Sequence, residues 1–204
     1  MLRLSKDQFE INFENGKKYI GHVLNEHFHG KGVLYQDDQI IYNGEFLKSK
    51  FHGKGTEYKN SLVLYVGSFF NGFKNGYGKV LYSNGEVQYD GYLDKNKRSG
   101  KGIYFLNNGN TRYDGCWLND KPNGLGIMYY FNGAIKYKGC FLNGKYDGEG
   151  TLYLPNFYIF VGKFVNDKIN GYGTLYYYDR QGHKQKKGYF NDDLELIYKN
   201  VSKV

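Results

Sequence analysis

Aromatic and apolar residues recur at every second position in many short stretches of the chain. In one kind of stretch an aromatic residue, a glycine and an apolar residue follow at a spacing of two, as in Tyr42-Asn-Gly44-Glu-Phe46. This spacing places all three on one face of a β-strand. The second kind follows a Gly-x-Gly pair and is apolar on both faces, as in residues 126–130. No segment has the spacing of three and four that a helix requires over helical length. The pattern therefore predicts an all-β protein.

Two series of glycines repeat in phase along the chain. The first glycine of each Gly-x-Gly pair recurs at steps of 23 or 24 residues, at Gly30, Gly53, Gly76, Gly100, Gly124, Gly148 and Gly171. The glycine of the aromatic stretch recurs with it, at Gly21, Gly44, Gly67, Gly91, Gly115, Gly139, Gly162 and Gly188. Such regularity indicates a repeat array.

Turn residues separate the two stretches of each repeat. Asn-Gly pairs favour hairpin turns because both residues can adopt φ > 0, and they occur at Asn71-Gly72, Asn84-Gly85, Asn108-Gly109, Asn132-Gly133 and Asn143-Gly144. Each repeat is therefore predicted to be a β-hairpin. The expected fold is an elongated single-layer antiparallel meander of about seven to eight hairpins, a β-solenoid-like rod or trough. The glycines are expected to let neighbouring rings lie flat on the backbone.

The predicted organisation is a single repeat domain over residues 1–204. Residues 1–18 are expected to add a capping hairpin strand, residues 19–190 to form the repeats, and residues 191–204 to cap the other end. The chain has 29 Gly, 2 Cys, 39 aromatic residues and a net charge of +8. So many aromatic residues argue against disorder, and so few cysteines indicate a reducing compartment. Without a signal peptide or a long apolar stretch, a cytoplasmic location is expected.

The repeat resembles the MORN (membrane occupation and recognition nexus) repeat. Residues 42–46, followed by His52-Gly53-Lys-Gly55, give the clearest copy. Later repeats have Asn, Ser or Asp at the histidine position, and Phe160 replaces the tyrosine in one repeat. The resemblance implies a stand-alone scaffold or adaptor without enzymatic activity, in a cytoskeletal or ciliary assembly or at a membrane surface.

The first functional hypothesis concerns the aromatic residues. A single-layer sheet covers its rings only in part, and exposed apolar area usually marks an interaction site. A trough of rings is thus predicted to bind a partner protein, whereas the alternative is that the rings form the whole core among themselves. The candidate partner-binding residues are Tyr89, Tyr113, Trp117, Tyr137, Phe141 and Phe164.

The second hypothesis concerns basic residues in the predicted turn inside each repeat. A row of lysines would suit anionic phospholipids such as phosphoinositides, an acidic protein, or simply solubility. The candidate lipid-binding residues are Lys74, Lys95, Lys97, Arg98, Lys121 and Lys145. Lysine predominates over arginine in this row, which argues against a nucleic-acid partner.

Other chemistry is weakly indicated. His29 and His52 lie one repeat apart, too far to share a metal ion, and Cys116 and Cys140 are similarly too far apart for a disulfide. No nucleotide-binding or hydrolase motif occurs. We therefore expect no metal, no cofactor and no catalytic residue. Pairing of exposed strand edges into a homo-oligomer is left open.

Overall fold

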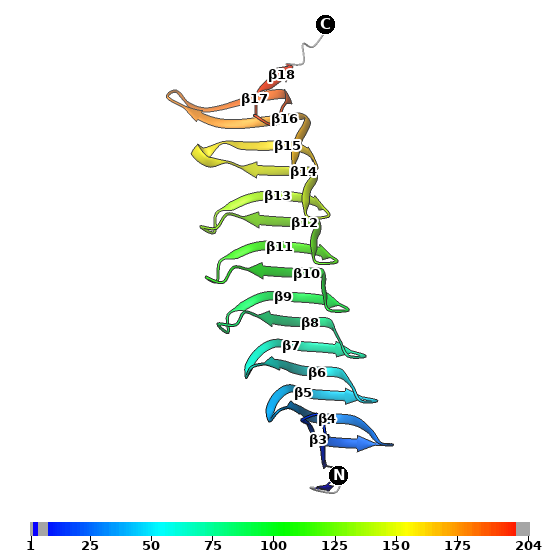
Figure 1. Ribbon diagram of the computed structural model, residues 1–204. Coiled ribbons are helices and arrows are strands. Elements are labelled where there is room, and N and C mark those ends of the chain that lie inside the picture. The colour runs from blue at the N-terminus through cyan, green and yellow to red at the C-terminus, as the bar shows by residue number, and fades with distance from the viewer. Residues whose placement is uncertain (1, 4–7, 199–204) are drawn as a thin grey trace. The chain divides into compact units, whose positions relative to one another are not determined.

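The computed structural model describes residues 2–3 and 8–198, and the chain divides into two compact units, residues 1–109 and 110–204 (Figure 1). The strands of the first unit are β1 (Leu2–Arg3), β2 (Phe9–Asn12), β3 (Lys17–Leu24), β4 (His27–Gln36), β5 (Gln39–Leu47), β6 (Lys50–Lys59), β7 (Leu62–Phe70), β8 (Phe73–Leu81), β9 (Val87–Asp94) and β10 (Lys97–Phe105). The elements of the second unit are β11 (Thr111–Leu118), β12 (Lys121–Tyr129), β13 (Ile135–Leu142), β14 (Lys145–Tyr153), the 3-10 turn η1 (Pro155–Phe157), β15 (Ile159–Val165), β16 (Lys168–Asp179), β17 (Gly182–Phe190) and β18 (Leu196–Tyr198).

Within each unit every strand pairs antiparallel with the next strand in the chain, so the strands of each unit form an open meander. Hairpins β3–β4, β5–β6, β7–β8 and β9–β10 belong to the first unit, and β11–β12, β13–β14 and β15–β16 to the second. The predicted all-β, single-layer antiparallel meander of hairpin repeats is confirmed.

Each unit has two kinds of turn along its two edges. The turns inside the hairpins define the hairpin edge, and the turns between successive hairpins define the linker edge (Figure 1). On the hairpin edge Asn71 and Gly72 have φ of 50° and 88°, the two left-handed residues of a type I′ turn. In the linker turn that contains Asn84-Gly85, the glycine has positive φ and the asparagine does not, and the Asn84 side chain accepts a 3.0 Å hydrogen bond from Glu86 N. The predicted turn geometry is therefore confirmed at Asn71 and wrong at Asn84, because a longer linker turn needs one left-handed residue only.

The glycines of one repeat have two different structural roles. Gly44 and Gly55 face each other across β5 and β6, and the ring of Tyr42 lies over both. A Cβ atom on Gly55 would lie 2.5 Å from Tyr42 Cζ, closer than packed carbons approach. Gly53 instead has φ of +58° and forms a bulge where β6 carries residues that β5 does not match. The expectation that rings lie flat on the backbone is thus confirmed for the paired glycines, and the bulge is a role that the sequence analysis missed.

The core of each unit is a ladder of these rings. Tyr42 makes edge-to-face contacts with Phe46 of its own hairpin and Phe69 of the next, both with centroids 5.1 Å apart. Its hydroxyl donates a 3.0 Å hydrogen bond to Glu45 O, which satisfies the one polar atom that the ring buries. The same contacts join Tyr137 to Phe141 and Phe164 in the second unit. Each ring therefore belongs to two hairpins at once, and this contact replaces the second layer that an ordinary sheet would need.

Additional strands extend both units. β2 pairs with β3 from Phe9↔Gly21 to Asn12↔Lys18, within the predicted N-terminal capping segment. β18 pairs with β17 through Phe190↔Leu196 and Tyr189↔Tyr198, within the predicted C-terminal cap. The rest of that cap, residues 199–204, and residues 1 and 4–7 lie outside the described residues. The single repeat domain and the capping roles stay predictions.

Candidate functional site: an apolar groove on the linker edge

The six rings predicted to bind a partner all lie in the core. Their exposed fractions are 5% or less. Trp117 occupies the position that Phe46 has in its hairpin, with its ring 4.9 Å from that of Tyr113 at 84°. Their burial agrees with the alternative interpretation of the sequence, in which the rings form the core among themselves. A docked partner segment would not reach these rings without displacing other side chains. The set comprises Tyr89, Tyr113, Trp117, Tyr137, Phe141 and Phe164.

Burial also sets the proton affinity of the core tyrosines. Burial raises the pKa of Tyr19 and Tyr65 to about 12, and it raises the pKa of Tyr113 and Tyr137 well above the ordinary value. A protonated hydroxyl in these positions donates to a backbone carbonyl, as Tyr113 does to Cys116 O at 2.9 Å. These tyrosines therefore serve as structural hydrogen-bond donors.

The predicted lipid-binding cations divide into two groups. Lys95 lies in a turn of the hairpin edge, Lys97, Lys121 and Lys145 each begin the strand after such a turn, and all four are exposed. Of the six residues predicted to lie in the turn, only Lys95 does so, and Lys74 and Arg98 lie farther from it than the others. Both are the second residue of a strand, the position where Phe51 stacks on Tyr42, so both reach over the rings.

The contacts of Lys74 and Arg98 explain their position. Lys74 Nζ lies 2.6 Å from Glu57 Oε2 and 5.2 Å from the ring centroid of Tyr65. The guanidinium of Arg98 lies 5.3 Å from the ring centroid of Tyr104. A cation over a ring face is favourable, so these two side chains cover the core in place of an aromatic ring.

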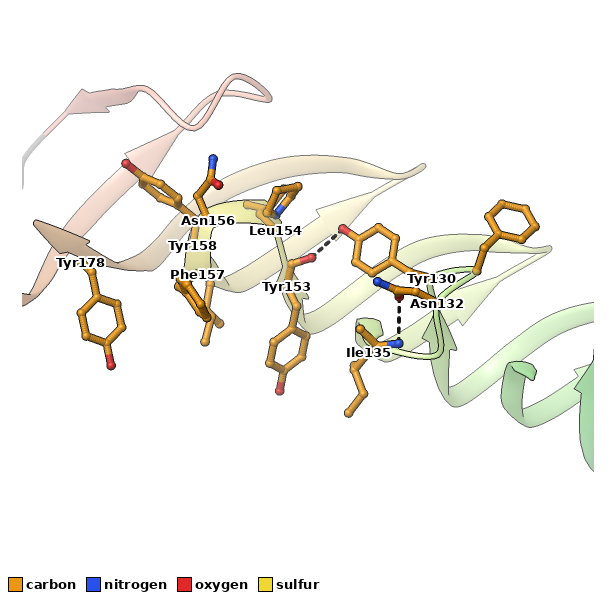
Figure 2. Close-up of a pocket in the computed structure, with 13 residues that line it drawn as sticks. Tyr130, Asn132, Ile135, Tyr153, Leu154, Asn156, Phe157, Tyr158 and Tyr178 are labelled. Atoms are coloured by element: carbon orange, nitrogen blue, oxygen red, sulfur yellow. Dashed lines mark hydrogen bonds between the residues drawn. The ribbon is translucent and has the colours of Figure 1, made fainter. Parts of the chain in front are cut away.

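An exposed apolar surface lies on the linker edge of the second unit. A groove of about 820 Å³ runs along the turns β12–β13 and β14–β15 and is bounded by Tyr178 of β16 (Figure 2). Phe131 and Phe157 project from the two turns with exposed fractions of 71% and 79%. Figure 2 shows Ile135, Tyr153 and Tyr178 pointing to the same side of the strands.

Hydrogen bonds fix the two turns that form the groove. The hydroxyl of Tyr130 donates to Tyr153 O at 2.7 Å, which ties the first turn to the second. Tyr130 N donates to Ala134 O and Leu154 N to Tyr158 O, both at 2.8 Å. The groove walls are therefore held in place before anything binds, which lowers the entropy cost of binding.

The backbone of η1 is strained where it presents Phe157. Asn156 and Phe157 have φ of 60° and 63°, a left-handed conformation that is uncommon for a bulky residue. The fold thus holds a phenylalanine in an unfavourable conformation and exposes it to water. Strain of this kind concentrates at functional sites.

The sequence analysis did not single out these groove residues. The available signal was the composition of the linker turns. In the first unit these turns carry Asp37-Asp38, Asn60-Ser61 and residues 82–86, which are polar or glycine apart from Tyr82, whereas the second unit places Phe131, Pro155 and Phe157 there. A turn is exposed whatever its sequence, so apolar residues in turns point to a contact surface more reliably than rings in strands do.

Comparison with known families agrees with this architecture. The family model for the MORN repeat matches six segments, residues 42–61, 65–87, 89–111, 113–135, 137–157 and 160–181. The chain belongs to the MORN repeat family. MORN repeats take part in protein or membrane binding, and the family is not generally enzymatic. A comparison with curated proteins finds no match.

The structure extends the MORN array beyond the matched segments. The β3–β4 hairpin precedes them, yet Tyr19 is buried and donates a 2.8 Å hydrogen bond to His22 O, as in the matched repeats. Among residues 2–3 and 8–198, no three His, Cys, Asp or Glu side chains group as metal ligands would. No helix in the described part of the chain has the length and hydrophobicity that crossing a bilayer requires.

Proposed function

We propose that this MORN protein is a non-enzymatic scaffold that docks a segment of a partner protein. The main observation behind this proposal is the groove on the linker edge of the second unit, where Phe131 and Phe157 are exposed in turns fixed by hydrogen bonds. Exposed, rigidly held rings are typical anchors of protein interfaces. The buried ring ladder supports this role by giving the groove a rigid base. A cytoskeletal or ciliary assembly is the proposed setting, as the resemblance of the sequence implied.

A peptide-display selection tests this proposal. The full chain serves as bait for a random-sequence peptide library, next to an unrelated bait of similar charge. The expected result is a family of enriched peptides that binds the wild-type protein with micromolar affinity, typical of short docking segments. Enrichment no greater than that on the unrelated bait would refute a protein-docking function.

Anionic lipid binding is the second candidate, supported by the exposed lysines of the hairpin edges. Lys95 and Lys97 lie on the first unit, and Lys121 and Lys145 on the second. A lysine near an anionic membrane contributes about 1 kcal/mol. Flotation with phosphoinositide vesicles at about 0.15 M salt tests this candidate, since bulk screening is already strong there. Flotation that survives replacement of all four lysines by glutamate would exclude these lysines as the lipid site.

A further inference from the structure

We propose that the occupant of the linker-edge groove is an extended acidic segment of the partner that carries bulky apolar side chains. This inference rests on the proposed protein-docking function and specifies the site and the chemistry of the ligand. We infer apolar side chains in the bound segment from the lining of the groove, in which aromatic and aliphatic side chains such as Phe131, Ile135 and Phe157 predominate. We infer acidic side chains in the bound segment from the positive charges around the groove.

Positively charged side chains contact the aromatic rings of the groove or their neighbours. The guanidinium of Arg112 lies 5.0 Å from the ring centroid of Phe131, and Lys136 Nζ lies 5.7 Å from that of Tyr130. Lys186 Nζ lies 5.3 Å from the ring centroid of Tyr177, whose ring stacks near Tyr158. Cationic groups from β11, β13 and β17 therefore border the groove.

Carboxylates do not offset this charge inside the groove. None of the residues that line it is Asp or Glu. Asp179, which follows the lining residue Tyr178, accepts a 2.8 Å hydrogen bond from Gln181 N within its own turn. Arg180 lies beside it at the tip of the β16–β17 hairpin. An apolar surface bordered by cations is complementary to an acidic segment.

The dimensions of the groove suit an extended chain. The groove crosses from Ile135 on β13 to Tyr178 on β16, three strand spacings or roughly 14 Å. About four residues of extended chain cover this distance at about 3.3 Å per residue. Two apolar side chains at a spacing of two would both face the groove.

A peptide fits this surface better than a membrane does. β16 pairs with β17 out to Asp179↔Gly182, six residues past Gly173, whereas β14 ends three residues past the equivalent Gly150. The paired strands of the β16–β17 hairpin, which ends in the polar tip Arg180-Gln181, therefore extend roughly 10 Å farther than the paired strands of β14–β15. A flat bilayer would meet this tip before Phe131 and Phe157, whereas a single extended chain can lie beside it.

Three synthetic peptides test the proposal against the full chain by fluorescence anisotropy at about 0.15 M salt, where weak nonspecific electrostatics are screened. The first has two bulky apolar residues flanked by Asp and Glu, the second replaces the acids by Lys, and the third replaces the apolar residues by Ala. We expect the first peptide to bind at least about tenfold more tightly than either of the others.

Variants locate the site. Phe157→Ser should weaken binding of the acidic apolar peptide by about tenfold or more, and the charge reversals Lys136→Glu and Arg180→Glu by about threefold to fivefold each. The matched controls Phe73→Ser, an exposed phenylalanine on the first unit, and Lys121→Glu, on the hairpin edge, should leave affinity unchanged. Because Phe157 is exposed, its replacement should leave the circular dichroism spectrum unchanged, so lost binding is not lost folding.

The outcomes separate this inference from the proposed function. Display-selected peptides whose affinity is insensitive to Phe157→Ser would overturn the groove assignment and leave protein docking intact. Equal affinity for the acidic and the lysine peptide would overturn the charge assignment. Binding to vesicles, but to no peptide, that is lost in Phe157→Ser would overturn the inference in favour of a membrane surface.

Discussion

The contact between a core ring and its glycine pair can be tested by adding one methyl group. In Gly126→Ala the new Cβ would lie 2.6 Å from Cζ of Tyr113, although packed carbon atoms prefer about 3.5–4.0 Å. The ring would have to move by about 1 Å. It is only 1% exposed and is held between Trp117 and Phe141, at centroid distances of 4.9 and 5.1 Å.

The cost of Gly126→Ala follows from two terms. Overpacking a closed core costs about 1–3 kcal/mol, and losing the hydrogen bond from Tyr113 to Cys116 O costs about 0.5–1.5 kcal/mol. We expect the free energy of unfolding to fall by about 2–4 kcal/mol. With a urea m-value of about 2 kcal/mol/M, the unfolding midpoint should fall by about 1–2 M. Urea titration followed by circular dichroism measures this shift.

Two further variants separate the steric clash from other effects. Gly133→Ala meets no atom within 4 Å, so its cost is the left-handed backbone alone, about 1–2 kcal/mol. In a Tyr113→Leu background the ring is absent, and Gly126→Ala should cost less than about 1 kcal/mol. An equal cost of Gly126→Ala in the wild-type and Tyr113→Leu backgrounds would refute the ring-on-glycine account of the core.

Three other predictions concern the turns, the core hydroxyls and the pH dependence. Ser61 has φ of 63° in a two-residue turn, a backbone conformation that glycine adopts without steric cost. Ser61→Gly should therefore raise the free energy of unfolding, measured by urea titration, by up to about 1 kcal/mol. A lower free energy of unfolding would show that the serine backbone is not strained in this turn. Phe160→Tyr should add about 0.5–1.5 kcal/mol by supplying the hydroxyl that other repeats have, provided that it reaches Lys163 O; a destabilised variant would show that this repeat has no room for it. Burial raises the pKa of Tyr19 and Tyr65 from 10.0 to about 12, so the folded state holds protons that the unfolded state releases. The contribution of these two groups to the free energy of unfolding should therefore be constant below pH 10 and fall as the pH rises from 10 to 12. Urea titrations at several pH values measure this change, and a free energy of unfolding that does not fall between pH 10 and 12 would contradict this expectation.

The sequence alone determined the repeat, the hairpins and which residues share a strand face. Tyr42, Gly44 and Phe46 recur with their neighbours at a fixed step, and strand alternation then requires them to share a face. Local rules were sufficient here because each contact joins residues within one hairpin or two adjacent ones. The same locality made the tight turn at Asn71-Gly72 predictable from its two residues.

Only the tertiary structure decided which aromatic residues water can reach. In the sequence Tyr113 and Phe131 are both ring residues of one repeat, yet the first has 1% of its surface exposed and the second 71%. The difference arises because the ring of Tyr113 packs between Trp117 and Phe141 of the next hairpin, while Phe131 projects from a turn. The positions of Lys74 and Arg98 over the rings were likewise set by the contact of Lys74 with Glu57 on β6 and that of Arg98 with Tyr104 on its own strand β10. Exposure and charge pairing depend on what adjacent hairpins place nearby, and a repeat pattern does not specify that.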